Sequence, residues 1–287
     1  MKFSYFNKSG SRFGLTSIAR GITSTLSTLA PKFSALLGET ILMKPYSRRE
    51  YYFEHIKPDK ELNLQTSMGI AHVNLFGSGD RVVIASHGWG DNSNSFDQMI
   101  LSLTRQGYTV AAIDHIGHGR SSGNSSNLLS FIETLELLIE QFNEERIEVD
   151  AIIGHSMGAI AALNLPNYLL ESKKVILISS PIKFFELMFE KVEQAGISRK
   201  LLTRVLESIS HQHGKKWQQL TTENNRDKLA LDLTFIHDRQ DRYAPFDDVT
   251  QYLQQEKNTL IETQGLGHRR ILSDTNVIKN ITQVLSA

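Results

Sequence analysis

The stretch that decides the fold is Val149-Asp150-Ala151-Ile152-Ile153-Gly154-His155-Ser156-Met157-Gly158, followed by the small-residue run 159–163. The apolar run at its start favours a strand, and the run after it favours a helix. Glycines two positions before and after Ser156 permit a sharp turn between the two elements. Such a turn lifts the serine hydroxyl above a sheet edge and leaves the first N–H groups of the helix available to an anion. Because Gly-x-Ser-x-Gly is short enough to arise by accident, the rest of the chain has to support this interpretation.

The composition is that of a globular protein whose partner is a small molecule. The chain has 287 residues, 40% of them hydrophobic and 22% charged, so it can bury a sizeable core. Basic and acidic residues number 31 each, and a formal net charge of zero does not favour nucleic acid. The chain has no cysteine, which excludes disulfides, thiolate zinc sites and a cysteine nucleophile. We therefore expect a cytoplasmic protein.

Residues 1–48 differ from the rest and are interpreted as an N-terminal helical extension. Basic residues precede the first acid, Glu39, and Pro31 predicts a break. Apolar residues follow the spacing of an amphipathic helix at Ile18, Ile22, Leu26, Leu29 and Phe33. Such a helix either packs on the main domain and covers its mouth, or serves as a targeting segment or membrane-surface anchor. No apolar run approaches the ~20 residues of a membrane span, so we expect a soluble protein with peripheral membrane contact through residues 1–44 left open.

From Arg49 onward, strand-like and helix-like runs alternate. Strands are expected at 69–76, 81–85, 108–113, 149–153, 174–178, 231–237 and 259–263, and helices at 96–107, 128–142, 157–170, 247–255 and 275–285. The turn 77–80 contains two glycines and predicts that the first two strands form a tight hairpin. The later alternation predicts a mostly parallel sheet with helices on both faces and a ligand site at the carboxyl ends of its strands.

The alternation lapses between Pro181 and Leu229. These residues keep a helical spacing but contain no strand-like run, so we interpret 182–229 as a helical cap inserted over the strand ends, with breaks at Gly196 and Gly214. The catalytic domain then comprises 49–181 and 230–287. Aromatic and methionine residues at 184, 185, 188 and 189 either pack this cap on the domain or form a wall of an acyl pocket.

A serine hydroxyl needs a general base, and the base needs an acceptor that fixes its tautomer. His268 follows the last expected strand in a glycine-rich loop and is the best candidate for the base. Asp241 follows the preceding strand, which gives the order Ser, Asp, His that this kind of site requires, and Asp238 is its nearest competitor.

An oxyanion has to be stabilised as well. The glycine-rich turn 86–90, Ser-His-Gly-Trp-Gly, follows the second expected strand and can direct a main-chain N–H at the site. The expected donors are the amides of Trp89 and Met157, each worth about 3 kcal/mol of transition-state stabilisation.

In these residues the chain resembles the α/β-hydrolase superfamily from about Gly69 to its end. The resemblance rests on His87-Gly88-Trp89, the run Asp114–Ser121, the stretch around Ser156, Asp241 with Pro245, and Gly267-His268, in that order. Residues 114–123 together with Gly-His-Ser-Met-Gly are most similar to the monoacylglycerol lipase and lysophospholipase branch. The N-terminal helix leading to Met43-Lys44-Pro45 is similar to that of uncharacterised bacterial hydrolases. The resemblance implies an α/β-hydrolase fold and hydrolysis of carboxylic esters through an acyl-enzyme; Asp238 stands where these enzymes usually carry glycine.

Other functions use the same residues. Thioester hydrolysis or acyl transfer needs the same machinery, and a non-catalytic binding protein can keep the fold. His115 and His118 have no carboxylate or cysteine at ligand spacing, so we expect no metal and no cofactor. The pattern does not predict the acyl group or the oligomeric state.

Overall fold

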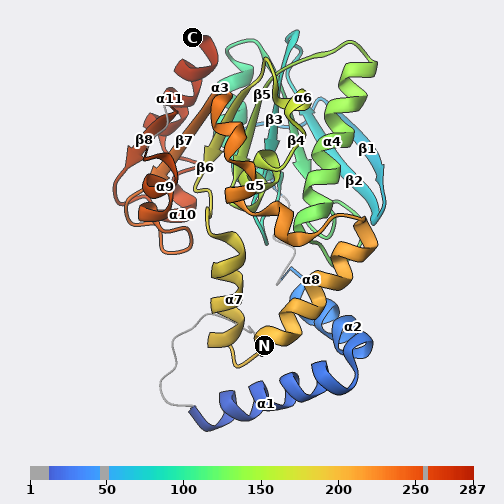
Figure 1. Ribbon diagram of the computed structural model, residues 1–287. Coiled ribbons are helices and arrows are strands. Elements are labelled where there is room, and N and C mark those ends of the chain that lie inside the picture. Colours follow the sequence, from blue (N-terminus) through green and yellow to red (C-terminus); the bar gives the residue numbers. More distant parts are fainter. Residues whose placement is uncertain (1–12, 46–51, 255–257) are drawn as a thin grey trace.

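A computed structural model describes residues 13–45, 52–254 and 258–287 and contains one eight-stranded sheet (Figure 1). Its strands lie in the order β1-β2-β4-β3-β5-β6-β7-β8. They span Lys60–Thr66 (β1), Gly69–Phe76 (β2), Arg81–Ser86 (β3), Tyr108–Asp114 (β4), Glu148–His155 (β5), Lys174–Ile178 (β6), Leu233–Asp238 (β7) and Thr259–Thr263 (β8). The pairs β1–β2 and β2–β4 are antiparallel, and β3 to β8 run parallel. The predicted mostly parallel sheet is confirmed.

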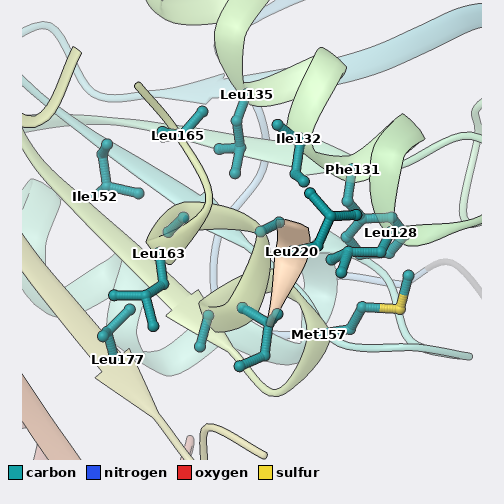
Figure 2. Close-up of a cluster of buried hydrophobic side chains, with 14 of the residues drawn as sticks. Leu128, Phe131, Ile132, Leu135, Ile152, Met157, Leu163, Leu165, Leu177 and Leu220 are labelled. Carbon is teal, nitrogen blue, oxygen red and sulfur yellow. The ribbon is translucent and has the colours of Figure 1, made fainter. Parts of the chain in front are cut away.

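Helices cover both faces of this sheet. The elements of the main domain are η1 (Ser93–Phe96), α3 (Asp97–Thr104), α4 (Leu128–Glu144), α5 (Met157–Leu163), α6 (Asn167–Leu170), α9 (Phe246–Leu253), α10 (Gly267–Arg270) and α11 (Thr275–Ser286). Side chains alternate across the strands, so Ile84 packs with α4 and α5, while Val83 packs with α3 and α11. Figure 2 shows part of the first cluster, with Leu128, Phe131, Ile132 and Leu135 of α4 and Met157 and Leu163 of α5. The sheet is therefore buried on both sides.

The predicted hairpin is wrong. β4 lies between β2 and β3, and the connection 77–80 crosses the beginning of β4 instead of closing a tight turn. Thr109 Oγ1 donates a hydrogen bond to the Gly79 carbonyl at 2.7 Å, and a Cβ on Gly79 would lie 1.7 Å from the Gly107 carbonyl oxygen. The two glycines thus serve a close backbone crossing. The edge strand β1 was not predicted, because its charged and polar residues leave only Leu64 and Thr66 buried.

Residues 182–229 contain α7 (Phe184–Gln194), α8 (Arg199–His213), η2 (Trp217–Leu220) and most of η3 (Thr222–Ala230), and lie between β6 and β7. The expected breaks occur, since Gly196 and Gly214 have φ of 81° and 66°. Figure 1 shows α7 and α8 extending from the end of the sheet that carries α5 and α10. The segment adds no strand to the sheet.

Two N-terminal helices, α1 (Phe13–Leu29) and α2 (Pro31–Leu42), pack beside α8 (Figure 1). Pro31 begins α2, as the break predicted there requires. Gly38 allows the close contact, because a Cβ at this position would lie 2.4 Å from Val205 Cγ2. The N-terminal part of the extension, including Lys2, Lys8 and Arg12, lies outside the described residues. Within the described ranges, we find no helix long and apolar enough to cross a membrane.

Candidate active site

Ser156 occupies the sharp turn between β5 and α5 with φ of 52° and ψ of −116°, a backbone conformation that is strained for serine. Its N–H donates to the Ile178 carbonyl of β6 at 2.9 Å, which fixes the turn on the neighbouring strand. The flanking glycines are required by packing. A Cβ on Gly158 would lie 2.2 Å from the Ser86 carbonyl oxygen, and one on Gly154 would lie 2.6 Å from Ala159 Cα. The turn therefore holds the Ser156 side chain at the carboxyl end of β5.

His268 lies in α10, in the connection after β8, and faces Ser156. Its Nε2 is 2.9 Å from Ser156 Oγ and its Nδ1 is 2.7 Å from Asp241 Oδ2. Because a carboxylate only accepts hydrogen bonds, Nδ1 carries the proton and Nε2 is free to accept from the serine hydroxyl. His155 Nε2 donates to the His268 carbonyl at 2.7 Å and fixes the backbone of the same residue. The three predicted residues are thus linked by two hydrogen bonds.

Asp241 is buried in the loop after β7. Its second oxygen accepts from the amides of Tyr243 at 2.8 Å and Ala244 at 2.9 Å. Burial by itself raises the pKa of Asp241, but the hydrogen bond and charge of His268 together with the two amides outweigh it and lower the pKa. The carboxylate is therefore ionised at neutral pH, as an acceptor for His268 needs.

Asp238 has a different set of partners. Oδ1 accepts from the Gln240 amide at 2.9 Å, and Oδ2 accepts from Thr263 Oγ1 at 2.8 Å and the Leu266 amide at 2.9 Å. The bonds of Oδ2 join the end of β7 to the end of β8 and to the loop that leads to His268. Asp238 thus supports the backbone near the histidine, whereas the bond to its imidazole comes from Asp241.

The amides predicted to bind an oxyanion are available. Neither the Trp89 nor the Met157 N–H has an acceptor among the residues that the structure describes. Trp89 follows Gly88, where a Cβ would lie 2.8 Å from Ser156 Cβ, so the loop after β3 passes directly beside the serine. Both residues line the same cavity as Ser156 and His268.

Two contacts that the sequence did not reveal hold the loop after β3. The Gly90 amide donates to His118 Nε2 at 3.0 Å. The buried Asp91 carboxylate pairs with Arg269, the residue after His268, at 2.8 Å. The only sequence signal is that Asp91 and Arg269 adjoin motif residues. The ion pair connects the loop that carries Trp89 to the segment that carries His268, and so fixes the distance between these two parts of the site.

The other histidines near the site are buried and engaged. His87 Nδ1 donates to the Gly88 carbonyl at 2.7 Å, and His115 Nε2 lies 2.7 Å from Ser86 Oγ. Burial lowers the pKa of both rings well below the ordinary value, and the neighbouring His118 adds to the effect. They are therefore neutral packing residues at neutral pH. Within the described ranges, no group of three ligand-type side chains suits a metal ion.

A cavity of about 960 Å³ opens over Ser156. Most of its wall is apolar and comes from the end of α2 with the following Met43, from α7, from α8 and from η2, including Phe184, Phe185, Met188, Leu202, Leu206 and Trp217. The aromatic and methionine residues that the sequence singled out therefore divide: three face the cavity, and Phe189 packs against Trp217 with ring centroids 5.8 Å apart. The charged side chains of the wall are the cationic Lys191 and Arg242.

A serine at a strand-to-helix turn, with an aspartate and a histidine after later strands of a mostly parallel sheet, defines an α/β-hydrolase fold. The chain belongs to the Hydrolase_4 family, described as serine aminopeptidase, S33, whose model matches residues 77–257. The resemblance to the α/β-hydrolase superfamily is thereby confirmed.

Individual relatives are more distant. The chain is 27% identical over 191 residues to serine hydrolase-like protein 2 of Homo sapiens, covering 56% of this chain and 58% of that protein. It is 28% identical over 142 residues to monoglyceride lipase of Rattus norvegicus, covering 47% and 45%. The match thus spans about half the length of these relatives. An esterase structure from Pyrococcus furiosus superposes with a TM-score of 0.61 and 18% identity, covering 85% of this chain and 97% of that one, which shows the fold alone.

Proposed function

We propose that the chain is a serine hydrolase that cleaves carboxylic esters through an acyl-enzyme. The observation that carries the proposal is the hydrogen-bonded series Asp241, His268, Ser156 at the floor of an apolar cavity. Family membership supports the same reaction class. In this proposal Ser156 is the nucleophile, His268 the general base and Asp241 the residue that stabilises the imidazolium.

Each step uses groups already in place. His268 Nε2 takes the Ser156 proton while Oγ attacks the ester carbonyl carbon, and the oxyanion accepts from the Trp89 and Met157 amides. The imidazolium then gives its proton to the leaving alkoxide oxygen, which leaves an acyl-serine. Water repeats the sequence: His268 takes a water proton, hydroxide attacks the acyl carbon, and the departing Ser156 oxygen regains a proton from His268.

The cavity wall favours a long apolar acyl chain. Methionine, leucine and aromatic side chains from α2, α7 and α8 surround the space above Ser156, and burying methylene groups against them contributes about 0.8 kcal/mol for each one. Substrates of this chemistry are acylglycerol-like or lysophospholipid-like esters. A panel of p-nitrophenyl esters of increasing acyl length tests this part, and we expect kcat/KM to rise with chain length. Turnover confined to acetyl and butyryl esters would contradict the lipase-like substrate.

The nucleophile is tested by covalent labelling. A fluorophosphonate should label the chain at Ser156, and Ser156→Ala should abolish both labelling and ester turnover. Ser102→Ala, on the outer helix α3, is the matched control and should label normally. If the chain is a non-catalytic binding protein, the fluorophosphonate should label neither the parent nor the Ser102→Ala variant.

Thioester hydrolysis and acyl transfer remain alternatives that use the same triad. Esters and thioesters of one acyl group, assayed with and without an added alcohol acceptor, separate the three reactions. We expect ester hydrolysis to be fastest and the acceptor to leave the yield of free acid unchanged. Peripheral membrane contact by residues 1–44, left open by the sequence, is likewise a proposal, and its structural basis lies in α1 and α2.

A further inference from the structure

α1 and α2 carry most of the exposed large hydrophobic side chains in the described part of the chain. We call these residues the apolar face: Leu15, Ile18, Ile22, Leu29, Phe33, Leu36, Leu37 and Ile41. Their exposure ranges from 39% for Leu37 to 78% for Leu29. Elsewhere in the described residues, only Tyr52, Ile70, Tyr168 and Tyr243 belong to this class. A gathering of exposed apolar side chains on two successive helices is the kind of feature that marks an interaction surface.

A surface helix usually turns its apolar side toward the core, but α1 and α2 turn their apolar sides away from the protein. The sides turned toward the protein carry small residues, and Ser27 and Ser34 are fully buried. Polar contacts hold this side in place: Arg20 Nη2 donates to the Glu193 carbonyl at 2.7 Å, and the Ser198 amide donates to Thr23 Oγ1 at 3.0 Å. The leucine, isoleucine and phenylalanine side chains consequently point outward. Hydrophobic burial in the monomer does not account for them.

The apolar face is continuous with the cavity over Ser156. Ile41, in the last turn of α2, is 43% exposed and also lines the cavity, and the next residues, Leu42 and Met43, continue the lining inward. An apolar molecule that leaves the outer surface at Ile41 therefore meets further apolar side chains on the way to the serine. This continuity favours an apolar substrate source over a globular partner as the occupant.

The charge of the same segment suits an anionic surface. Residues 13–45 contain Arg20, Lys32 and Lys44 against the single acid Glu39. Glu39 accepts from Gln212 Nε2 at 3.1 Å on α8 and so lies on the protein side of α2. Lys200 of α8 joins the basic groups, because its Nζ donates to Thr28 Oγ1 of α1 at 2.8 Å. Basic groups at the border of an apolar helical face are the pattern by which amphipathic helices bind anionic phospholipid.

We propose that the apolar face docks on an anionic phospholipid bilayer and that its Ile41 end admits lipid to the catalytic cavity. The first part stands on the surface alone, while the second rests on the proposed ester hydrolysis. Docking inserts the side chains of α1 and α2 into the boundary between head groups and acyl chains, with the exposed Lys32 and Lys44 facing phosphate. The substrate then moves between two apolar environments without crossing water.

The experiment uses the full chain carrying Ser156→Ala, so that binding is separated from hydrolysis. Sedimentation with vesicles of phosphatidylcholine mixed with phosphatidylglycerol measures binding, and pure phosphatidylcholine vesicles are the charge control. Ile18→Ser combined with Ile22→Ser should weaken binding about tenfold or more, since each removes a large apolar side chain from the lipid. Tyr168→Ser is the matched control: Tyr168 is equally exposed, at 63%, but lies on α6, at the other end of the molecule from α1 in Figure 1. It should bind normally.

A second measurement tests the charge and the fold. Lys32→Gln should reduce binding to the anionic vesicles with little effect on the weak binding to pure phosphatidylcholine. With Ser156 restored, the double serine variant should hydrolyse dissolved p-nitrophenyl butyrate at the parental rate and the same ester class in vesicles more slowly. Absence of butyrate turnover in the parent would refute the proposed function while leaving vesicle binding as a separate result.

Three outcomes would overturn the docking proposal. One is equal sedimentation of the parent and the double serine variant. Another is binding that does not distinguish anionic from neutral vesicles. The third is that the parent does not bind vesicles but forms a concentration-dependent dimer, and that the double serine variant does not dimerise. This outcome would make the apolar face an interface between two copies of this chain.

Discussion

Asp238, the last residue of β7, and Asp241 in the following loop lie three residues apart, yet their carboxylates have different neighbours. Asp241 contacts the His268 imidazole, while Asp238 is surrounded by backbone amides and Thr263. Sequence order made both of them candidates. The difference comes from the path of the chain, which turns the later side chain toward the histidine and the earlier one toward the Gln240 amide and toward Thr263 and Leu266.

The proposed roles lead to different effects in the two asparagine variants. Asp241→Asn should lower kcat by about 10³- to 10⁴-fold, because an amide neither fixes the productive tautomer nor stabilises the imidazolium. Asp238→Asn should lower it much less and reduce thermal stability, since the loop loses acceptors. Steady-state hydrolysis of p-nitrophenyl butyrate checks both. Unchanged turnover in Asp241→Asn together with lost turnover in Asp238→Asn would assign the acid to Asp238.

His155 makes stability depend on pH. Burial and the nearby His268 lower its pKa from 6.5 to about 3, despite the bond to the His268 carbonyl. In the unfolded chain, His155 is protonated below about pH 6.5, whereas in the folded chain it stays neutral down to about pH 3. Protonation of His155 therefore favours the unfolded state, and this effect grows as the pH falls from 6.5 to 3. Its contribution to the loss is up to about 1.4 kcal/mol per pH unit.

His155→Gln should reduce this dependence. Urea unfolding at pH 7 and pH 4.5 measures the free energy of unfolding, and the drop between the two should be smaller in the variant by about 1–3 kcal/mol. The comparison at pH 7 corrects for any packing change. An identical drop in both proteins would show that His155 is not buried in its neutral form.

At the scale of the element, each segment that carries a candidate catalytic residue follows the carboxyl end of a parallel strand. β3, β5, β7 and β8 end at the same edge, so Trp89, Ser156, Asp241 and His268 meet there although they span about 180 residues of sequence. This part of the arrangement follows from parallel pairing and was predictable. The contribution of α2 to the cavity wall was not, because nothing local shows where an N-terminal helix docks.

A substitution at Gly38 tests how much α2 contributes to the cavity wall. Gly38→Val places a side chain against Val205 and should lower the free energy of unfolding by about 1–3 kcal/mol. Displacement of α2 should also reduce kcat/KM for a long-chain p-nitrophenyl ester more than for the butyryl ester. Gly21→Val is the matched control, since a Cβ at Gly21 meets nothing within 4 Å. If kcat/KM depended on acyl chain length in the same way in both variants, α2 would not contribute to substrate binding in the cavity.

At the scale of the whole molecule, charge and shape act together. The formal net charge is zero and the sequence pI is about 7.2, while α1 and α2 expose a large apolar face. A protein without net charge lacks the repulsion that keeps such surfaces apart. The exposed apolar face is therefore expected to favour association of the molecules where their net charge is zero.

Solubility should pass through a minimum near neutral pH. Static light scattering at fixed concentration should show the most association around pH 7 and less at pH 9, where the chain is negatively charged. Replacing Ile18 and Ile22 by serine should flatten this profile. Association that is independent of pH and of these two side chains would contradict the argument.

The sequence by itself determined the fold class, the order of the candidate catalytic residues and the breaks at Pro31, Gly196 and Gly214. These features depend on hydrophobic period, glycine and proline geometry, and the rule that parallel strands end at one edge, all of which act over short stretches or by topology. The roles of Ser156, Asp241, His268, Trp89 and Met157 stay predictions that the variants above test.

Only the tertiary structure decided which strands are neighbours, which carboxylate reaches His268 and which way the N-terminal helices face. The hairpin 69–85 was wrong because β4 inserts between β2 and β3, a long-range pairing that no local turn signal encodes. The apolar spacing of α1 predicted a helix with one apolar side, but not its direction, because polar anchors such as Arg20 to Glu193 bind a surface that lies some 170 residues away in the chain. Direction and pairing are properties of the assembled surface, so they appear only when the whole chain is folded.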